Sequence, residues 1–304
     1  MTTDPPIAYA GEPGAFAEDG VIAAFGDVSR ISLGSFRDVF EAVAAGDAAA
    51  GVVPIENVIN GTVRENYDLL LEYQLQIRGE IVVPVELSLA ALPGQRLDDI
   101  QRVYSHIQAL GQAEGFLRRR PWQLLTTYNT AGAGKSIVDR GERGAAAVLS
   151  PRAAAVFGLE ILAGDIGDAA DNRTRFIIIG PAPVDAASPT RAIDEASPTS
   201  AFDRAPATSA TDGTWRTTLA FGVRNEPGSL IRALRVFADR GVNLSRLESR
   251  PSRSRAWEYV FWTDVDGSAS GTDVAASLMD LAAVTTFVRV LGSYRRATEP
   301  PEGD

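Results

Sequence analysis

The chain has 304 residues, of which 45% are hydrophobic and 22% charged, so it is long enough for two domains with buried cores. Its formal net charge of −10 at pH 7 argues against a general nucleic-acid binder, which needs a basic surface. It contains no cysteine, which excludes disulfides and thiolate metal sites. No apolar run approaches the ~20 residues that cross a bilayer and the N-terminus lacks signal-peptide features, so we expect a cytoplasmic protein that does not bind membranes.

Short apolar segments alternate with amphipathic segments over the first 180 residues. A turn at Gly11–Gly14 opens a helix that runs through Phe25. We expect strands at 7–9, 51–55, 77–83, 86–92, 103–105 and 176–179, and helices at 36–45, 62–73, 108–119 and 131–140, with the segments 145–148 and 152–156 continuing the alternation. This pattern predicts an α/β open sheet that binds ligands beyond the carboxyl ends of its strands.

Residues 181–213 are rich in Pro, Ser, Thr, Ala and Asp and poor in large apolar residues. Such a segment buries too little surface to offset its ordering entropy, so a mobile linker is predicted, and a plain spacer is favoured over a phosphorylated regulatory segment. Beyond it, strands are expected at 217–223, 242–249, 257–263 and 287–291, and helices at 228–240 and 272–283. This β-α-β-β-α-β order is that of a ferredoxin-like fold.

The expected organisation is therefore a first domain at 5–180, a linker at 181–213, a second domain at 214–296 and a disordered tail at 297–304.

Four polar clusters lie near the expected strand ends of the first domain. In the first, Glu56-Asn57 is followed by the turn Asn60–Thr62; because Thr62 also suits a helix N-cap, a capped turn is as good an interpretation as a binding site. The other three are Ser105–Gln108 with Gln112 on the same helical face, Tyr128–Ala133 at the start of a helix, and Asn172–Phe176 with Asp168 upstream. A helix start of small and hydroxyl residues presents backbone N–H groups to an anion.

Several kinds of site are not indicated. His106 is the only histidine and has no carboxylate or nucleophile paired with it in the pattern, so a structural or solvent-facing role is favoured. Pro13 breaks any dinucleotide fingerprint at Gly11–Gly14, and neither a phosphate loop nor a metal-binding motif is seen, so no cofactor and no metal are expected. The remaining hydroxyls, amides and guanidinium groups suit a small polar anion, with Thr174 as a candidate for proton handling.

These motifs, in this order, resemble the prephenate dehydratase family, including the plant-type arogenate dehydratases. The matching text is Gly51-Val52-Val53-Pro54-Ile55-Glu56-Asn57, Asn66-Tyr67-Asp68-Leu69-Leu70-Leu71, Ser105-His106-Ile107-Gln108-Ala109-Leu110 and Asn172-Arg173-Thr174-Arg175-Phe176. The second domain resembles an ACT regulatory domain through Asn225-Glu226-Pro227-Gly228-Ser229-Leu230 and Glu248-Ser249-Arg250-Pro251. The resemblance implies a catalytic domain of two α/β lobes, similar to periplasmic binding proteins, followed by a ferredoxin-like ACT domain.

The resemblance also implies a reaction, the decarboxylative dehydration of prephenate to phenylpyruvate. Thr174 would donate a proton or hydrogen bond to the leaving hydroxyl, and Asn57, Ser105 and Gln112 would orient the substrate. Arg175 is either a partner of a substrate carboxylate or a member of a structural ion pair. The further residues expected at the substrate are Asn172, Thr130 and Glu56.

For the ACT domain the resemblance implies feedback control by L-phenylalanine, bound at a subunit interface of a homodimer or homotetramer. The expected effector residues are Asn225, Gly228, Ser229, Leu230, Glu248 and Ser249.

The chain departs from the family pattern at several positions. Ala15 and Ala17 stand where Thr and Ser are frequent, Val58 where Ser is usual, Ile107 where Pro is usual, and Ala113 where Cys is usual. Either other groups compensate for the lost hydroxyls, or the substrate differs, or the activity is reduced. Two alternatives therefore stay open: an arogenate dehydratase that forms phenylalanine directly, and a non-catalytic amino-acid sensor.

Overall fold

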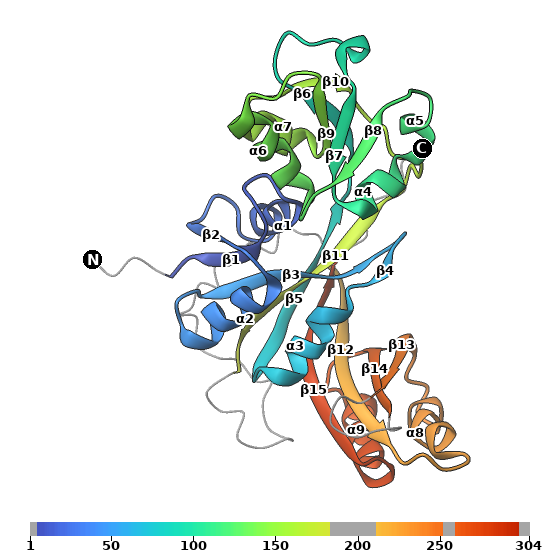
Figure 1. Ribbon diagram of the computed structural model, residues 1–304. Coiled ribbons are helices and arrows are strands. Elements are labelled where there is room, and N and C mark those ends of the chain that lie inside the picture. The colour runs from blue at the N-terminus through green and yellow to red at the C-terminus, as the bar shows by residue number, and fades with distance from the viewer. Residues whose placement is uncertain (1–4, 183–210, 252–258, 298–304) are drawn as a thin grey trace. The chain divides into compact units, whose positions relative to one another are not determined.

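The computed structural model describes residues 5–182, 211–251 and 259–297 (Figure 1). The chain forms two compact units. The first contains most residues up to Phe176, and the second combines the short segment Leu70–Glu80 with the residues from Ile177 onward. Three sheets organise these units, two in the residues before 182 and one after 211.

The first lobe is built on the sheet β2-β1-β3-β11-β5, with the short β4 paired to β3. Its elements are β1 (Ile7–Ala10), α1 (Phe16–Phe25), β2 (Arg30–Leu33), α2 (Phe36–Ala45), β3 (Ala50–Asn57), β4 (Gly61–Thr62), α3 (Arg64–Glu72), β5 (Leu75–Pro84) and β11 (Arg173–Pro181). β1 runs parallel to both β2 and β3. The first four residues of β3 are all buried, as expected for a central strand covered on both faces.

Local signals delimit α2 as the sequence predicts. The Ser35 hydroxyl accepts the Asp38 amide while the Asp38 carboxylate accepts the Ser35 amide, which is a capping box. Gly46 closes the helix at a φ of 83°, in the left-handed region that glycine adopts without strain.

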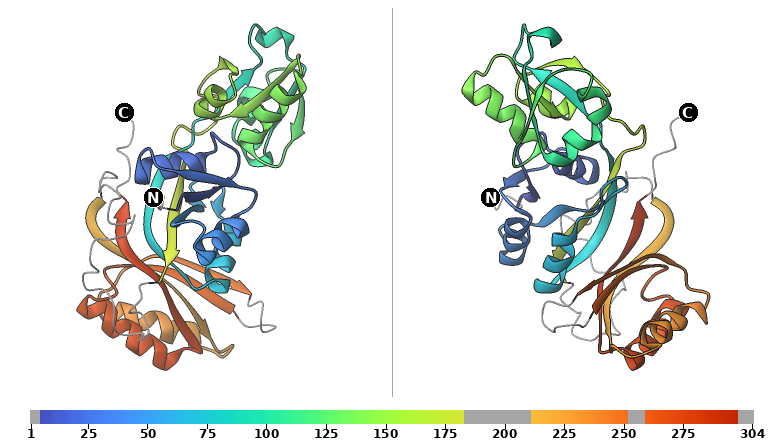
Figure 2. Two further views of the ribbon diagram at one scale, coloured as in Figure 1. Left: turned by 90° about the vertical axis from the view of Figure 1, so that its left-hand side faces the viewer. Right: turned by 45° about the vertical axis from the view of Figure 1, so that its right-hand side comes forward.

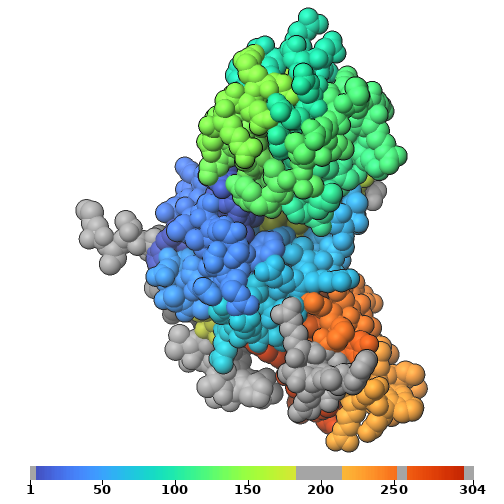
Figure 3. Space-filling model, in the orientation of Figure 1, coloured from blue at the N-terminus to red at the C-terminus, as the bar shows by residue number. Residues whose placement is uncertain are grey.

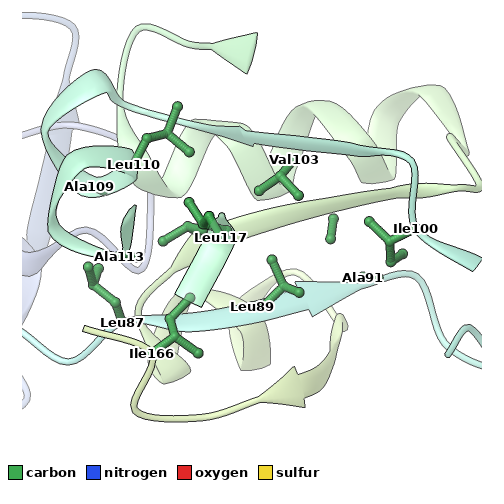
Figure 4. Packing of buried hydrophobic residues seen from close by; sticks show 12 residues of the cluster. Leu87, Leu89, Ala91, Ile100, Val103, Ala109, Leu110, Ala113, Leu117 and Ile166 are labelled. Carbon is green, nitrogen blue, oxygen red and sulfur yellow. The ribbon is translucent and has the colours of Figure 1, made fainter. Parts of the chain in front are cut away.

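The second lobe is built on the sheet β10-β6-β9-β7-β8. Its elements are β6 (Ser88–Ala91), η1 (Leu97–Asp99), β7 (Arg102–Ser105), α4 (Ile107–Gln112), α5 (Glu114–Leu117), β8 (Gln123–Thr126), α6 (Thr130–Arg140), β9 (Ala145–Leu149), α7 (Pro151–Val156) and β10 (Glu160–Ala163). Leu87, Leu89, Val103, Leu110 and Leu117 form its core together with Ile166 (Figure 4). The atoms of this lobe, coloured green, are closely packed on the face turned to the viewer in Figure 3. Two lobes of α/β type are thus confirmed.

The ACT-like part is a sheet of four antiparallel strands in the order β13-β14-β12-β15. Its elements are β12 (Thr211–Val223), α8 (Ser229–Ala238), β13 (Leu244–Pro251), β14 (Tyr259–Asp266), α9 (Thr272–Val284) and β15 (Phe287–Ala297). Both helices cover the same face of the sheet (Figures 1 and 2). The Phe221 and Phe261 rings stack there with centroids 5.3 Å apart. The predicted β-α-β-β-α-β order is confirmed.

A buried ion pair joins this sheet to the segment Leu70–Glu80 of the same unit. Nη1 of Arg216 donates to both carboxylate oxygens of Glu80 at 2.7 Å, and the Ala297 amide donates to Oε1 at 3.0 Å. The Arg289 guanidinium donates to the carbonyls of Leu71 and Tyr73 at 2.8 and 2.7 Å. The sheet therefore has specific polar contacts with the end of α3, with the turn after it and with the middle of β5.

Some expected boundaries are corrected. The predicted helix 108–119 is interrupted at Ala113 between α4 and α5. The helix predicted from Thr62 begins at Arg64, because Thr62 pairs with Glu56 in β4, so Thr62 is not its N-cap. β11 extends to Pro181 and β12 begins at Thr211, so both strands reach into the range 181–213 that was expected to be a linker. Residues 183–210 of the expected linker and 298–304 of the expected tail lie outside the described residues.

Four strands were not predicted: β2, β4, β8 and β10. β4 has only two residues. β2, β8 and β10 are each four residues long and lie at an end of their sheet, where exposed and polar side chains weaken the apolar pattern. In the described part of the chain, no helix is long and apolar enough to cross a membrane.

Candidate active site

The carboxamide of Asn57 lies at the end of β3, and its orientation is defined by backbone contacts. Its Oδ1 accepts the amides of Ile59 and Asn60 at 3.1 and 2.9 Å, as in an Asx turn. Its Nδ2 must then point the other way. The chain turns at residues 58–60, earlier than the predicted Asn60–Thr62, because Gly61 and Thr62 form β4. The turn aims the side-chain NH₂ group.

That NH₂ group reaches the other predicted end of the site, on β11. Its two hydrogens are shared among three acceptors: Oδ1 of Asn172 at 2.8 Å, Oγ1 of Thr174 at 3.0 Å and the Arg173 carbonyl at 3.0 Å. The three side chains of Asn57, Asn172 and Thr174 are 8–9% exposed. Residues more than 110 positions apart in the chain are therefore brought into one buried polar cluster.

Thr174 acquires a defined role as acceptor in this cluster. Because an amide nitrogen only donates, the Thr174 oxygen accepts from Asn57, and its own hydrogen stays available. Among the described residues, no protein group accepts that hydrogen. The hydroxyl can therefore donate to a bound molecule.

Glu56 and Arg175 lie on the same strands as Asn57 and Thr174, but on the other face of the sheet. Successive side chains of a strand point to opposite faces, which separates Glu56 from Asn57 and Arg175 from Thr174. Nη2 of Arg175 is 3.2 Å from Oε2 of Glu56, and the Arg175 side chain is largely buried. This contact favours the structural ion pair over a substrate carboxylate as the role of Arg175, and a substrate role for Glu56 stays a prediction.

Ser105, Gln112 and Thr130 belong to the second lobe, and no hydrogen bond in the described residues joins them to the Asn57 cluster. The Ser105 hydroxyl is fully buried and donates to the Val148 carbonyl at 2.6 Å, so only its lone pairs are left for other groups. Gln112 ends α4 with a half-buried side chain that makes no hydrogen bond to a described residue. Thr130 is the first residue of α6, whose N-cap is Asn129. Their contribution to a substrate site stays a prediction.

The anion site expected at the start of α6 is partly occupied by the protein itself. Oδ1 of Asn129 accepts the Gly132 amide at 2.5 Å. One of the free N–H groups of this helix end is thus already satisfied.

His106 has the structural role that the sequence favours. It is the N-cap of α4, and its Nδ1 accepts the Gln108 amide at 3.3 Å. Burial lowers the pKa of His106, so the imidazole is neutral near pH 7. A neutral ring that accepts at Nδ1 is a poor proton donor, which leaves Thr174 as the stronger candidate.

Two of the positions that depart from the family pattern expose apolar side chains. Val58, directly after Asn57, is 67% exposed and Ile107 is 60% exposed. Ala17 is buried in α1. The Val58 amide donates to the Arg173 carbonyl at 3.0 Å, so the backbone of this position still belongs to the site although no hydroxyl is present.

Sequence reasoning missed one cluster that links the two lobes. Glu12, in the loop after β1, accepts from the Tyr128 hydroxyl at 3.0 Å and from Nζ of Lys135 at 3.1 Å. Burial and the neighbouring Glu12 raise the pKa of Tyr128, and the hydrogen bond with Glu12 raises that of Lys135. Lys135 is the only lysine of the chain, and that rarity was the available signal. Where the structure describes the chain, it contains no group of three acidic or histidine side chains that could hold a metal.

Comparison with known proteins identifies the family. The family model described as prephenate dehydratase matches residues 7–184, and the ACT domain model matches 217–283. The chain belongs to the prephenate dehydratase family. It is 35% identical over 294 residues to the bifunctional chorismate mutase/prephenate dehydratase of Aquifex aeolicus, a match that covers 96% of this chain and 74% of that protein. It is also 35% identical to arogenate dehydratase/prephenate dehydratase 2 of Arabidopsis thaliana, over 95% of this chain and 72% of that one. The family is one of lyases.

Solved structures agree with this assignment. The prephenate dehydratase of Arthrobacter aurescens, in complex with L-Phe, is 33% identical and superposes with a TM-score of 0.81, covering 98% of this chain and 92% of that chain. A structure with 30% identity and the same TM-score is GqqA, described as a novel type of quorum-quenching acylase; the match covers 96% of this chain and 98% of that one. The recognition of family, fold and second domain from the sequence is confirmed.

Proposed function

We propose that this protein converts prephenate to phenylpyruvate, carbon dioxide and water. The observation that carries the proposal is the Thr174 hydroxyl, which accepts from Asn57 and keeps its hydrogen for a bound molecule in a buried cluster. Family membership supplies the reaction class. The two together support a role for Thr174 as the donor to the leaving group.

The chemistry explains why one donor suffices. Loss of the ring carboxylate and of the 4-hydroxyl creates an aromatic ring, so the overall reaction is strongly downhill. The barrier lies in expelling hydroxide, which requires a proton or a strong hydrogen bond at the departing oxygen. A threonine hydroxyl is a weak acid, but a preorganised donor in a water-poor site contributes about 3 kcal/mol to the transition state. Neither a metal nor an organic cofactor is part of this proposal.

The second substrate to consider is arogenate, because the Arabidopsis relative is named for both activities. Arogenate carries an amino group where prephenate carries a keto group, so it would give phenylalanine instead of phenylpyruvate. Purified protein incubated with each substrate separately distinguishes them by product. We expect phenylpyruvate from prephenate at the higher kcat/KM; a higher kcat/KM for arogenate would reassign the substrate.

An acylase function, which the description of GqqA raises, is less well supported by the described residues. A threonine nucleophile needs an adjacent base. Thr174 contacts the Asn57 amide instead, and the only histidine caps α4. The arrangement fits hydrogen-bond donation better than nucleophilic attack. Turnover of either dehydratase substrate would exclude a sensor without catalysis.

We further propose that L-phenylalanine regulates the enzyme through the ACT domain. Gly228, at a φ of 79°, begins α8 in a conformation that favours glycine, and the neighbouring Asn225 is exposed. Ser229 is buried and accepts from Arg232, while Leu230 packs against the domain core. Glu248 and Ser249 lie on β13, which is at the end of the strand order. An edge strand suits an interface with a second copy of the chain, as a homodimer or homotetramer.

Glu248→Ala should weaken inhibition by phenylalanine and leave the rate without phenylalanine unchanged. The Glu248 carboxylate accepts from Nη2 of Arg246 at 2.9 Å. Glu248 lies on β13, in a different sheet from β3 and β11, so its removal should spare the chemistry. We expect the half-inhibitory phenylalanine concentration to rise at least ~5-fold, within the range of allosteric coupling energies. Glu226→Ala, in the exposed loop before α8, is a matched control for charge. Unchanged inhibition in Glu248→Ala would place the effector elsewhere. Cytoplasmic location and the absence of nucleic-acid and membrane partners stay predictions.

A further inference from the structure

The segment between β10 and β11 passes close to α4 and α5 before it reaches Thr174. It is anchored first at Ile166, which is buried in the core of the second lobe and whose amide donates to the Leu87 carbonyl at 2.9 Å. Asp168 follows two residues later and lies six residues before Thr174. This segment is therefore the direct connection from the second lobe to the strand that carries the proposed proton donor.

Asp168 makes contacts on both sides of the break between α4 and α5. Its backbone amide donates to the carbonyl of Gln112, the last residue of α4, at 2.7 Å. Its two carboxylate oxygens both accept the amide of Gly115, in the first turn of α5, at 3.0 Å. These groups are a carbonyl at a helix C-terminus and an amide at a helix N-terminus, neither of which has a partner within its own helix.

Gly115 is required for this contact by its lack of a side chain. A Cβ at this position would lie 2.6 Å from Oδ1 of Asp168. Any other residue would push the carboxylate away. The pair Asp168–Gly115 is thus a close steric and hydrogen-bonding fit between two segments 53 positions apart.

The position of Gln112 depends on contacts between α4 and the segment that contains Asp168. α4 has only six residues, and helices this short are not stable by themselves. The Gln112 side chain makes no hydrogen bond to a described residue that would set its place, so its backbone position decides where its carboxamide is presented. The Asp168 amide bonds directly to that backbone.

We propose that Asp168 is a positioning residue for the dehydratase reaction, which acts by placing Gln112 for contact with the substrate. The proposal rests on the proposed function of Gln112. The carboxylate binds the Gly115 amide, this contact places the backbone of residue 168, and its amide in turn holds the end of α4. One short segment then sets both Gln112 and, six residues on, Thr174.

The test is a double-mutant cycle on the full-length protein with prephenate as substrate. Asp168→Ala should lower kcat about tenfold, since small displacements of a positioned group cost rates of this order. Asp168→Asn should stay within ~3-fold of wild type, because asparagine accepts a helix-start amide as well as aspartate does. In a Gln112→Ala background, Asp168→Ala should cost less than ~2-fold, since the group it places is gone. A tenfold loss that persists in that background, or no loss in Asp168→Ala alone, would overturn the proposal.

A matched control and a second measurement separate this proposal from the proposed function. Glu114→Ala removes an exposed carboxylate of α5, paired to Arg118, and should change kcat less than ~2-fold. Hydrogen exchange at the amides of 115–118 should be about fivefold faster in Asp168→Ala, as for loss of a helix cap, but not in Asp168→Asn or Glu114→Ala. If the wild-type protein does not turn over prephenate, the dehydratase function alone is refuted. If the amides of 115–118 exchange at the same rate in Asp168→Ala and in the wild type, the role of Asp168 is refuted.

Discussion

Replacing Thr174 by valine should lower kcat on prephenate at least ~100-fold, as for the loss of one preorganised transition-state donor. Valine keeps the branched shape and strand preference of threonine and removes only the hydroxyl. The side chain is 9% exposed and its one described hydrogen bond is accepted from Asn57, so the fold should survive. Steady-state kinetics gives kcat, and circular dichroism with thermal unfolding confirms the folded state.

Thr174→Ser is the matched control for this change, because it retains the hydroxyl and loses a methyl group. It should retain at least ~10% of the wild-type kcat, since the donor is still present. Near wild-type rates in Thr174→Val would remove the residue from the mechanism. Equal losses in the valine and serine variants would show that packing, and not the hydroxyl, is what matters at this position.

Arg216→Ala should lower the free energy of unfolding by about 3–5 kcal/mol, because it removes a guanidinium group that a buried carboxylate contacts directly. The side chains of Arg216 and Glu80 are 8% and 1% exposed, and the guanidinium donates to both carboxylate oxygens. Glu80 also accepts the Ala297 amide, which is uncharged. Urea unfolding followed by tryptophan fluorescence measures the change. The double replacement Glu80→Leu/Arg216→Met should recover most of it, since apolar groups of similar volume often substitute for a buried pair.

Asp280→Ala provides the control in the same domain. Its carboxylate lies 2.5 Å from Nη2 of Arg240, but half of the Asp280 side chain is exposed. Solvent screens such pairs, so the loss should not exceed ~1 kcal/mol. If Arg216→Ala destabilises the protein no more than Asp280→Ala does, the buried pair is not a significant link between β5 and the ACT sheet.

The parts of the fold that the sequence predicts are those with strong local signals. The apolar runs of β3 and β11 and the helix expected at 36–45 all agree with the structure. The edge strands β2, β8 and β10 could not be predicted, because their polar residues lack the pattern of a buried strand. Their identity as strands comes from pairing with neighbours remote in sequence.

The site divides in the same way. The order of motifs places Asn57, Asn172 and Thr174 in one site, and the structure joins them by hydrogen bonds. Long-range contacts such as Asp168 with Gly115, or Glu12 with Tyr128, leave no periodic trace in the chain and required the structure. The separation of Arg175 from Thr174 was available from the sequence, since adjacent residues of a strand point to opposite faces.

The central claim is that this buried cluster catalyses the coupled loss of carbon dioxide and water from prephenate. The most direct measurement is a timed reaction of the purified protein with prephenate in which phenylpyruvate and carbon dioxide are both quantified. We expect the two products in a one-to-one ratio at an initial rate proportional to enzyme, with Thr174→Val at most ~1% as fast. Absence of both products with wild-type protein that is folded would contradict the account.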